Sequence, residues 1–248
     1  RRTRLGLAIP GYETTPTGHD SGQLYYRMLN CGVRLPLIGG TDKMSAARPV
    51  GSVARTYAKV DEWTHNGLMN GIREGNTFVT NGPLLAFSAN RAQMGGELQF
   101  SGEGPFMIEI RGRCITQRPV NYLQVVHNGK VIHEVRSEDY QLRLNLFLEL
   151  NVTESGWIAL RAGADKPDAE DWWNYTMAAH TSPIYITVNN EPPANADDAR
   201  YLLARLDTTL RWAEEEAIWS SANSKRTALD SFRKARSIYS SALRRASE

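Results

Sequence analysis

The middle of the chain alternates between apolar and polar positions with a period of two. In residues 142–150 every second residue is leucine, and the positions between are mostly polar. This alternation is typical of a β-strand with one buried face. Asn128-Gly129 lies between two further apolar stretches and predicts a tight hairpin turn. Similar short segments continue to about residue 190, so residues 78–190 are expected to form an immunoglobulin-like β-sandwich.

The end of the chain has a different period. Pro192 and Pro193 end the last alternating segment, and apolar residues then recur at intervals of three and four along residues 197–221 and 224–246. This spacing predicts two helices that turn back on each other at the sequence SSANS, so that residues 195–248 form a helical hairpin. The first helix is mainly acidic and the second mainly basic, which favours pairing between the helices over a nucleic-acid surface.

The first 77 residues indicate α/β structure. Leu5 to Ile9 form a short apolar run, and residues 21–32 have the N-cap serine, the apolar face and the final glycine of a helix. A second apolar run, Leu35 to Ile38, leads through two glycines to Asp42. Such a strand–helix–strand unit is typical of a parallel sheet or barrel, where catalytic groups gather at the carboxyl ends of the strands. Residues 61–75 predict a further helix.

Composition narrows the class of protein only a little. The chain has 248 residues, a formal net charge of +2 and 41% hydrophobic residues, as expected of a globular protein whose partners are neither nucleic acid nor an acidic membrane. No apolar run is long enough to span a bilayer. Cys31 and Cys114 lack metal-binding spacing and are expected to be buried thiols. Because the sequence opens within an apparent strand and without an initiator methionine, we expect a piece of a longer protein, and its localisation is not indicated.

Four stretches of the chain resemble one family. They are YYRMLNCGVRLPLIGGTD at 25–42, GLMNGIREGNTFVTNGPLL at 67–85, AHTSPIYITV at 179–188 and RKARSIY at 233–239. Together they are similar to the C-terminal part of the CehA/McbA-type metallohydrolases, relatives of the PHP (polymerase and histidinol phosphatase) superfamily. The resemblance implies that residues 1–77 are the closing strand–helix elements of a PHP-like (βα) barrel.

The resemblance also implies an activity and a metal site. Such enzymes hydrolyse ester, carbamate or phosphoester bonds of small molecules through a hydroxide bound to zinc, manganese or iron. Asp42 matches the metal-binding aspartate of the last barrel strand, and the other ligands are expected from an N-terminal part that precedes Arg1. Met44 stands where the family often has histidine, and a thioether is a poor ligand for these ions. The alternative role of Asp42 is to cap the next turn.

Four further residues are candidates for function, each with an ordinary alternative. His19 lies in a loop at the catalytic end of the expected barrel and is either an acid–base group or a solvated side chain. Arg34 either binds a substrate oxyanion or forms an ion pair. His180 is expected to form a hydrogen bond at the junction between barrel and sandwich, with direct catalysis as the alternative. Asn81 is expected in a fixed turn, Asn81-Gly82-Pro83, that joins the two. A second hypothesis for the whole chain is a non-catalytic sandwich that binds a partner and carries a degenerate barrel remnant.

Overall fold

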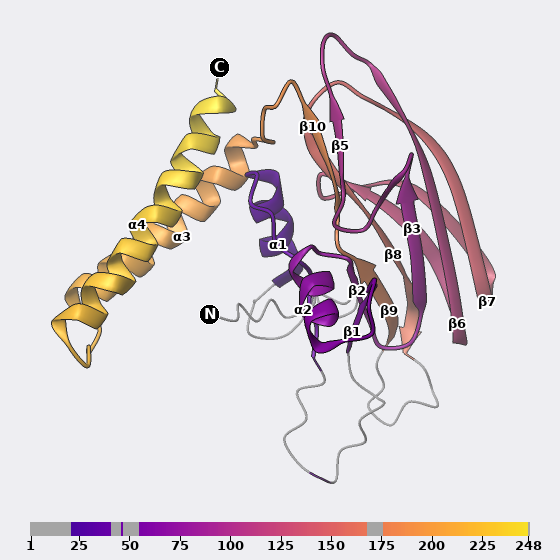
Figure 1. Cartoon of the computed structure of the whole chain (residues 1–248), viewed down its shortest axis with the longest axis horizontal. Helices are drawn as coiled ribbons and strands as arrows, with labels where there is room; N and C mark the ends of the chain where they lie inside the picture. The colour runs from indigo at the N-terminus through magenta and orange to yellow at the C-terminus, as the bar shows by residue number, and fades with distance from the viewer. Residues whose placement is uncertain (1–20, 41–45, 47–54, 168–175, 248) are drawn as a thin grey trace.

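The computed structural model describes residues 21–40, 46, 55–167 and 176–247. These residues form four helices and one ten-stranded sheet, which curls around its own core (Figure 1). The helices are α1 (Ser21–Asn30), α2 (His65–Arg73), α3 (Ala196–Glu215) and α4 (Ala222–Arg245). The strands are β1 (Arg55–Ala58), β2 (Thr77–Thr80), β3 (Leu84–Ala89), β4 (Ala92–Gln93), β5 (Glu97–Phe100), β6 (Phe106–His127), β7 (Lys130–Val152), β8 (Gly156–Pro167), β9 (Thr176–Thr181) and β10 (Ile184–Val188).

Two long antiparallel strands, β6 and β7, organise the sheet. They meet at Asn128-Gly129, where both residues have positive φ angles of 48° and 86°. Two left-handed residues in a two-residue loop are the signature of a type I′ turn, so the predicted hairpin is confirmed. The first half of β6 pairs with β3, and its second half pairs with β8. Register shifts between Ile115 and Tyr122 mark this change of neighbour and let the sheet bend.

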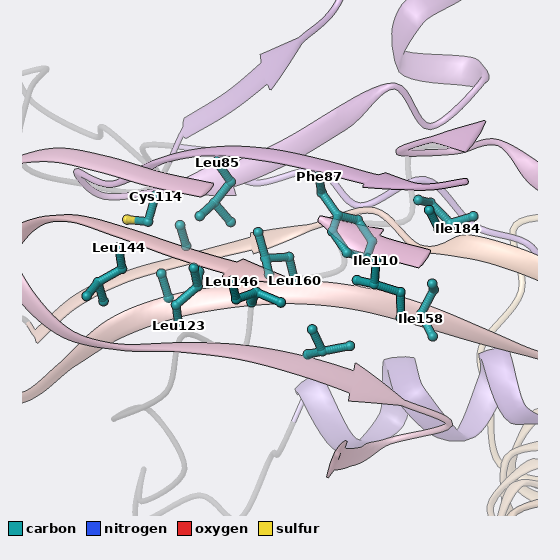
Figure 2. Close-up of a cluster of buried hydrophobic side chains, with 14 of the residues drawn as sticks. Leu85, Phe87, Ile110, Cys114, Leu123, Leu144, Leu146, Ile158, Leu160 and Ile184 are labelled. Atoms are coloured by element: carbon teal, nitrogen blue, oxygen red, sulfur yellow. The ribbon is translucent and has the colours of Figure 1, made fainter. Parts of the chain in front are cut away.

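The strands face one another across one large hydrophobic core. Figure 2 shows side chains from β3, β6, β7, β8 and β10 converging on the same space. Ile110, Leu123, Ile158 and Ile184 are fully buried there. Cys114 also lies in this core as a free thiol, and burial raises its pKa to about 12. The alternation of apolar residues therefore buries one face of β3 and of the first half of β6, as the sequence predicts, whereas residues 120–126 in the second half of β6 are buried on both faces.

The helical hairpin predicted at the end of the chain is present. Asn195 caps α3 through its side chain, and Ser221 begins α4 with a reciprocal capping box. Arg236 of α4 bonds Asp207 of α3 at 2.7 Å, so basic and acidic side chains do pair between the helices. Figure 1 shows the two helices lying alongside each other and projecting away from the sheet.

Helix α1 connects the sheet to the hairpin. On one side Tyr25 and Leu29 pack against Trp157 of β8. On the other, Leu24 and Met28 pack with Leu202 of α3, with small residues of both hairpin helices and with buried Cys31, which directly follows α1. Helix α1 therefore belongs to the boundary between the two larger parts of the structure.

One expectation from the N-terminal third is wrong. The apolar run from Leu35 to Ile38 was expected to be a strand, but residues 33–40 form no ladder with any described strand. Helix α2, by contrast, lies within the predicted residues 61–75. The described part of the chain thus shows a curled, mainly antiparallel sheet with helices, while the PHP-like barrel and the division at residues 77 and 190 stay predictions.

Candidate functional site

The extended segment 33–40 is attached to the sheet through side-chain hydrogen bonds. Ser182 accepts a bond from the backbone N–H of Leu37 at 3.0 Å, and Thr77 donates to the carbonyl of Leu37 at 2.7 Å. The hydroxyls of Ser182 and Thr77 also bond each other at 2.7 Å, and both residues are fully buried. Thr56 bonds both the N–H and the carbonyl of Gly39, at 2.8 and 2.7 Å. With the hydroxyl of Tyr25, which donates to the carbonyl of Leu35 at 3.0 Å, four hydroxyls thus replace the strand partner that the segment lacks.

His180 joins this region to α1. Its Nε2 lies 2.6 Å from the hydroxyl of Tyr26, and its Nδ1 lies 2.7 Å from the carbonyl of Thr181. Because a carbonyl only accepts, Nδ1 carries the proton and Nε2 accepts the Tyr26 hydroxyl. Burial, together with the nearby guanidinium of Arg161, lowers the pKa of His180 to about 4. His180 is therefore neutral, with both ring nitrogens in use, which leaves neither of them for a metal ion.

A row of polar side chains continues from His180 across the sheet. Arg161 of β8 lies opposite His180 and donates from Nε to the amide oxygen of Gln124 on β6. Gln124 is buried and donates in turn to Glu134 of β7. The pKa of Glu134 is lowered, mainly by its bond from Arg136. This row is a charged and hydrogen-bonded band on the sheet face opposite the main core.

Arg34 forms an ion pair rather than an open anion site. Its guanidinium bonds Glu97, lies 3.2 Å from the hydroxyl of Thr187 and stacks 4.8 Å from the ring of Tyr185. The bond from Arg34 lowers the pKa of Glu97 to about 2. The described structure therefore shows the ion pair, and the binding of a substrate oxyanion by Arg34 stays a prediction.

Asn81 lies between β2 and β3, where the sequence predicts a turn. Its backbone N–H donates to the carbonyl of Ala178 at 3.1 Å, and its side-chain oxygen accepts from the N–H of the same residue at 2.8 Å. Asn81 thus extends the pairing of β2 with β9 by one residue.

The metal site predicted from the sequence falls outside the described residues. Asp42 and His19 both lie in parts of the chain that the structure does not describe. Among residues 21–40, 46, 55–167 and 176–247, no three histidine, cysteine, aspartate or glutamate side chains are grouped to hold a metal ion. The described residues therefore do not by themselves fit a divalent metal. Within them, moreover, every helix is too short or too polar to cross a membrane.

A polar groove lies between the hairpin and one end of the sheet. Its volume is about 800 Å³. Glu154 and Glu191 contribute to the wall formed by the ends of the strands, and Arg245 contributes to the wall formed by α4. The Nε of Arg245 is buried and has no hydrogen-bond partner in the described part of the chain. This groove was not predicted from the sequence, because it forms between turns that are distant along the chain.

Comparisons with known proteins add little to this geometry. No family model matches the chain, and no curated protein matches it. One similar solved structure is described as "Structures of Clostridium thermocellum CbhA fibronectin(III)-like modules", with 14% sequence identity and a TM-score of 0.22. The match covers 41% of this chain and 92% of that one. A TM-score this low transfers neither fold nor function.

The sequence did not indicate the hydrogen-bond partners of His180. Tyr26, Arg161 and Gln124 were not among the candidate residues that the sequence indicated. The signal that existed was His180 itself, a histidine a few residues ahead of a strongly apolar strand. Such a residue needs a buried hydrogen-bond partner, but the sequence does not say that the partner lies 154 residues away.

Proposed function

We propose that this chain is the C-terminal part of a metal-dependent hydrolase that cleaves ester, carbamate or phosphoester bonds. Its described residues form the support on which the segment leading to Asp42 is held. The expected chemistry follows from the family resemblance. The structural support is that the stretches that carry this resemblance lie close together in the fold.

The observation that carries the proposal is the convergence of those stretches. Leu37 belongs to the first, Thr77 to the second and Ser182 to the third, and the three residues are joined by buried hydrogen bonds of 2.7–3.0 Å. Tyr239, from the fourth stretch, packs in the cluster that contains Cys31 at the end of α1. Stretches spread over more than 200 positions therefore gather around α1 and segment 33–40, which ends two residues before Asp42.

Buried hydroxyls in this place favour a positioning role. Thr77 and Ser182 are each fully buried. If apolar residues stood in their places, the backbone N–H and C=O of Leu37 would lose these hydrogen-bond partners. The bonds fix the path of the chain up to Gly39. Since the described residues hold no metal-binding group, we assign them no catalytic step, and Asp42 is the residue proposed to bind the metal.

The test is the metal content of the full-length protein. Wild type and Asp42→Ala are purified and their bound zinc, manganese and iron measured. Asp61→Ala is the matched control, because Asp61 is an exposed aspartate on the same part of the chain. We expect Asp42→Ala to lose metal and hydrolysis of a model ester while Asp61→Ala keeps both. Equal metal content in all three proteins would remove Asp42 from the site.

The groove between sheet and hairpin favours a second function, that of a non-catalytic binding module. Glu154, Glu191 and Arg245 offer charges of both signs in a space of about 800 Å³, which is large enough for a small ligand. The two functions separate in one experiment. A ligand that stabilises wild type and Asp42→Ala equally, but not Arg245→Ala, supports the binding module.

A further inference from the structure

Among the strands that the structure describes, none covers the outer edge of β7 along its length. The strand has 23 residues and pairs with β6 on one side, and no other described strand pairs with it. Figure 1 shows β7 at the outermost edge of the sheet, on the side away from the helices. Such an edge presents a row of unpaired backbone N–H and C=O groups to any strand that can lie alongside it.

Residues 142–150 of this edge are regular and apolar. Their register with β6 runs without a shift from Arg143 to Val152, so no bulge turns the edge away. Leu144 and Leu146 point into the core (Figure 2), whereas Leu142 is 50% exposed and Phe147 is 51% exposed. Natural edge strands of this length are generally protected by bulges, prolines or like charges, and residues 142–150 have no proline and one charge of each sign.

The two charged residues are placed symmetrically. Arg143 and Glu149 lie three positions to either side of Leu146, and both are exposed. Both point to the same face of the sheet, because their positions differ by an even number. Neither forms an ion pair or a side-chain hydrogen bond with any other residue that the structure describes.

We propose that residues 142–150 pair antiparallel with the same residues of a second copy of this chain. In the register that sets Leu146 opposite Leu146 of the second copy, Arg143 lies opposite Glu149 of that copy, and the reverse pair repeats across the two-fold axis. Leu142 then faces the other copy's Leu150, and Leu144 its Leu148. Cross-strand pairs of opposite charge and of matching leucines both stabilise antiparallel sheets.

This register is the one that the side chains select. A slip of one residue sets leucines of one copy opposite the polar positions of the other. A slip of two residues keeps the faces but places Arg143 opposite Phe147 or Asn151, so that both ion pairs are lost. A second copy is the partner that fits, because opposite charges at equal distances from a centre complement themselves in a two-fold arrangement. The proposal stands on β7 alone and is independent of the metal site.

Sedimentation velocity of the whole chain over a wide range of concentrations tests the dimer. We expect a monomer–dimer equilibrium in wild type. Arg143→Glu and Glu149→Arg each replace two attractive pairs by two repulsive ones and should raise the dissociation constant roughly tenfold or more. The double variant R143E/E149R restores the complementarity and should return the constant to near the wild-type value. Arg211→Glu, an equal charge change on the exposed surface of α3, should leave it unchanged.

The register has its own test. The variant N145C/F147C places a cysteine of one copy opposite a cysteine of the other, and oxidation should give a covalent dimer, while the native Cys31 and Cys114 are buried. A chain that stays monomeric at every concentration overturns the proposal. So does a dimer that both single charge reversals leave intact, since its interface would then lie elsewhere.

Discussion

The hydroxyl of Tyr26 donates a hydrogen bond of 2.6 Å to Nε2 of His180, and this contact ties α1 to β9. The two rings lie 5.6 Å apart, and Tyr26 also packs 4.9 Å from the ring of Trp157. Trp157 in turn donates from Nε1 to Asn30 at 2.7 Å, and Asn30 donates to Asp198 of α3 at 2.8 Å. One short helix therefore links the sheet and the hairpin through bonds that are partly buried.

Removing the Tyr26 hydroxyl should destabilise the protein. Tyr26→Phe keeps the ring but leaves Nε2 of buried His180 without its donor, which costs about 1–3 kcal/mol of unfolding free energy. Chemical denaturation of both proteins measures the difference. Tyr57→Phe is the control, because Tyr57 is 40% exposed and its hydroxyl has no partner among the described residues. Equal losses in the two variants would show that the bond contributes nothing specific.

The stability of the protein should fall in mild acid because of His180. Its pKa is about 4 in the folded state and about 6.5 when unfolded, so the folded state binds fewer protons. The contribution of neutral His180 to the free energy of unfolding is complete above pH 6.5. It is lost as the pH falls toward 4, and the loss reaches about 3 kcal/mol. His180→Gln should give a flatter profile over this range. Urea unfolding at several pH values checks it, and identical slopes in the two proteins would contradict the assignment.

The ion pair of Arg34 with Glu97 should have a modest structural effect. Since Arg34 is half exposed, we expect the coupling between Arg34→Met and Glu97→Gln to be about 1 kcal/mol or less at neutral pH. Because the pKa of Glu97 is depressed to about 2, the contribution is present above pH 4.5 and disappears as pH falls through 2. A double-mutant cycle measures it. If Arg34→Met instead removed hydrolysis in the full-length protein without changing stability, Arg34 would be a substrate-binding residue.

Loss of the hydroxyl at Ser182 should release segment 33–40. Ser182→Ala leaves the buried N–H of Leu37 unpaired and should cost about 1–3 kcal/mol. In the full-length protein it should also lower metal affinity, because the segment leads directly to Asp42. Denaturation and metal titration give the two readouts. Ser137→Ala removes an exposed hydroxyl that bonds a backbone carbonyl and is the control; a loss of stability without any change in metal affinity would separate the segment from the proposed site.

The local predictions succeeded where neighbouring residues decide the structure. Asn128-Gly129 specifies its turn because Asn and Gly both tolerate positive φ angles. The leucines from 142 to 150 specify a strand and its buried face, and the spacing of three and four after residue 196 specifies the two helices. The strand prediction for residues 35–38 is wrong, although these residues are mostly apolar. A strand forms only where another backbone lies beside it, and here side-chain hydroxyls occupy that place.

By itself, the sequence determined which residues turn, which face the core and which belong to helices, since periodicity and turn chemistry act over a few residues. Only the tertiary structure decided that His180 bonds Tyr26, that Arg34 is neutralised by Glu97 and that β7 is left at the edge of the sheet. Those contacts join residues separated by up to 154 positions. Their energies depend on burial and on the path of the whole chain, which no local pattern contains.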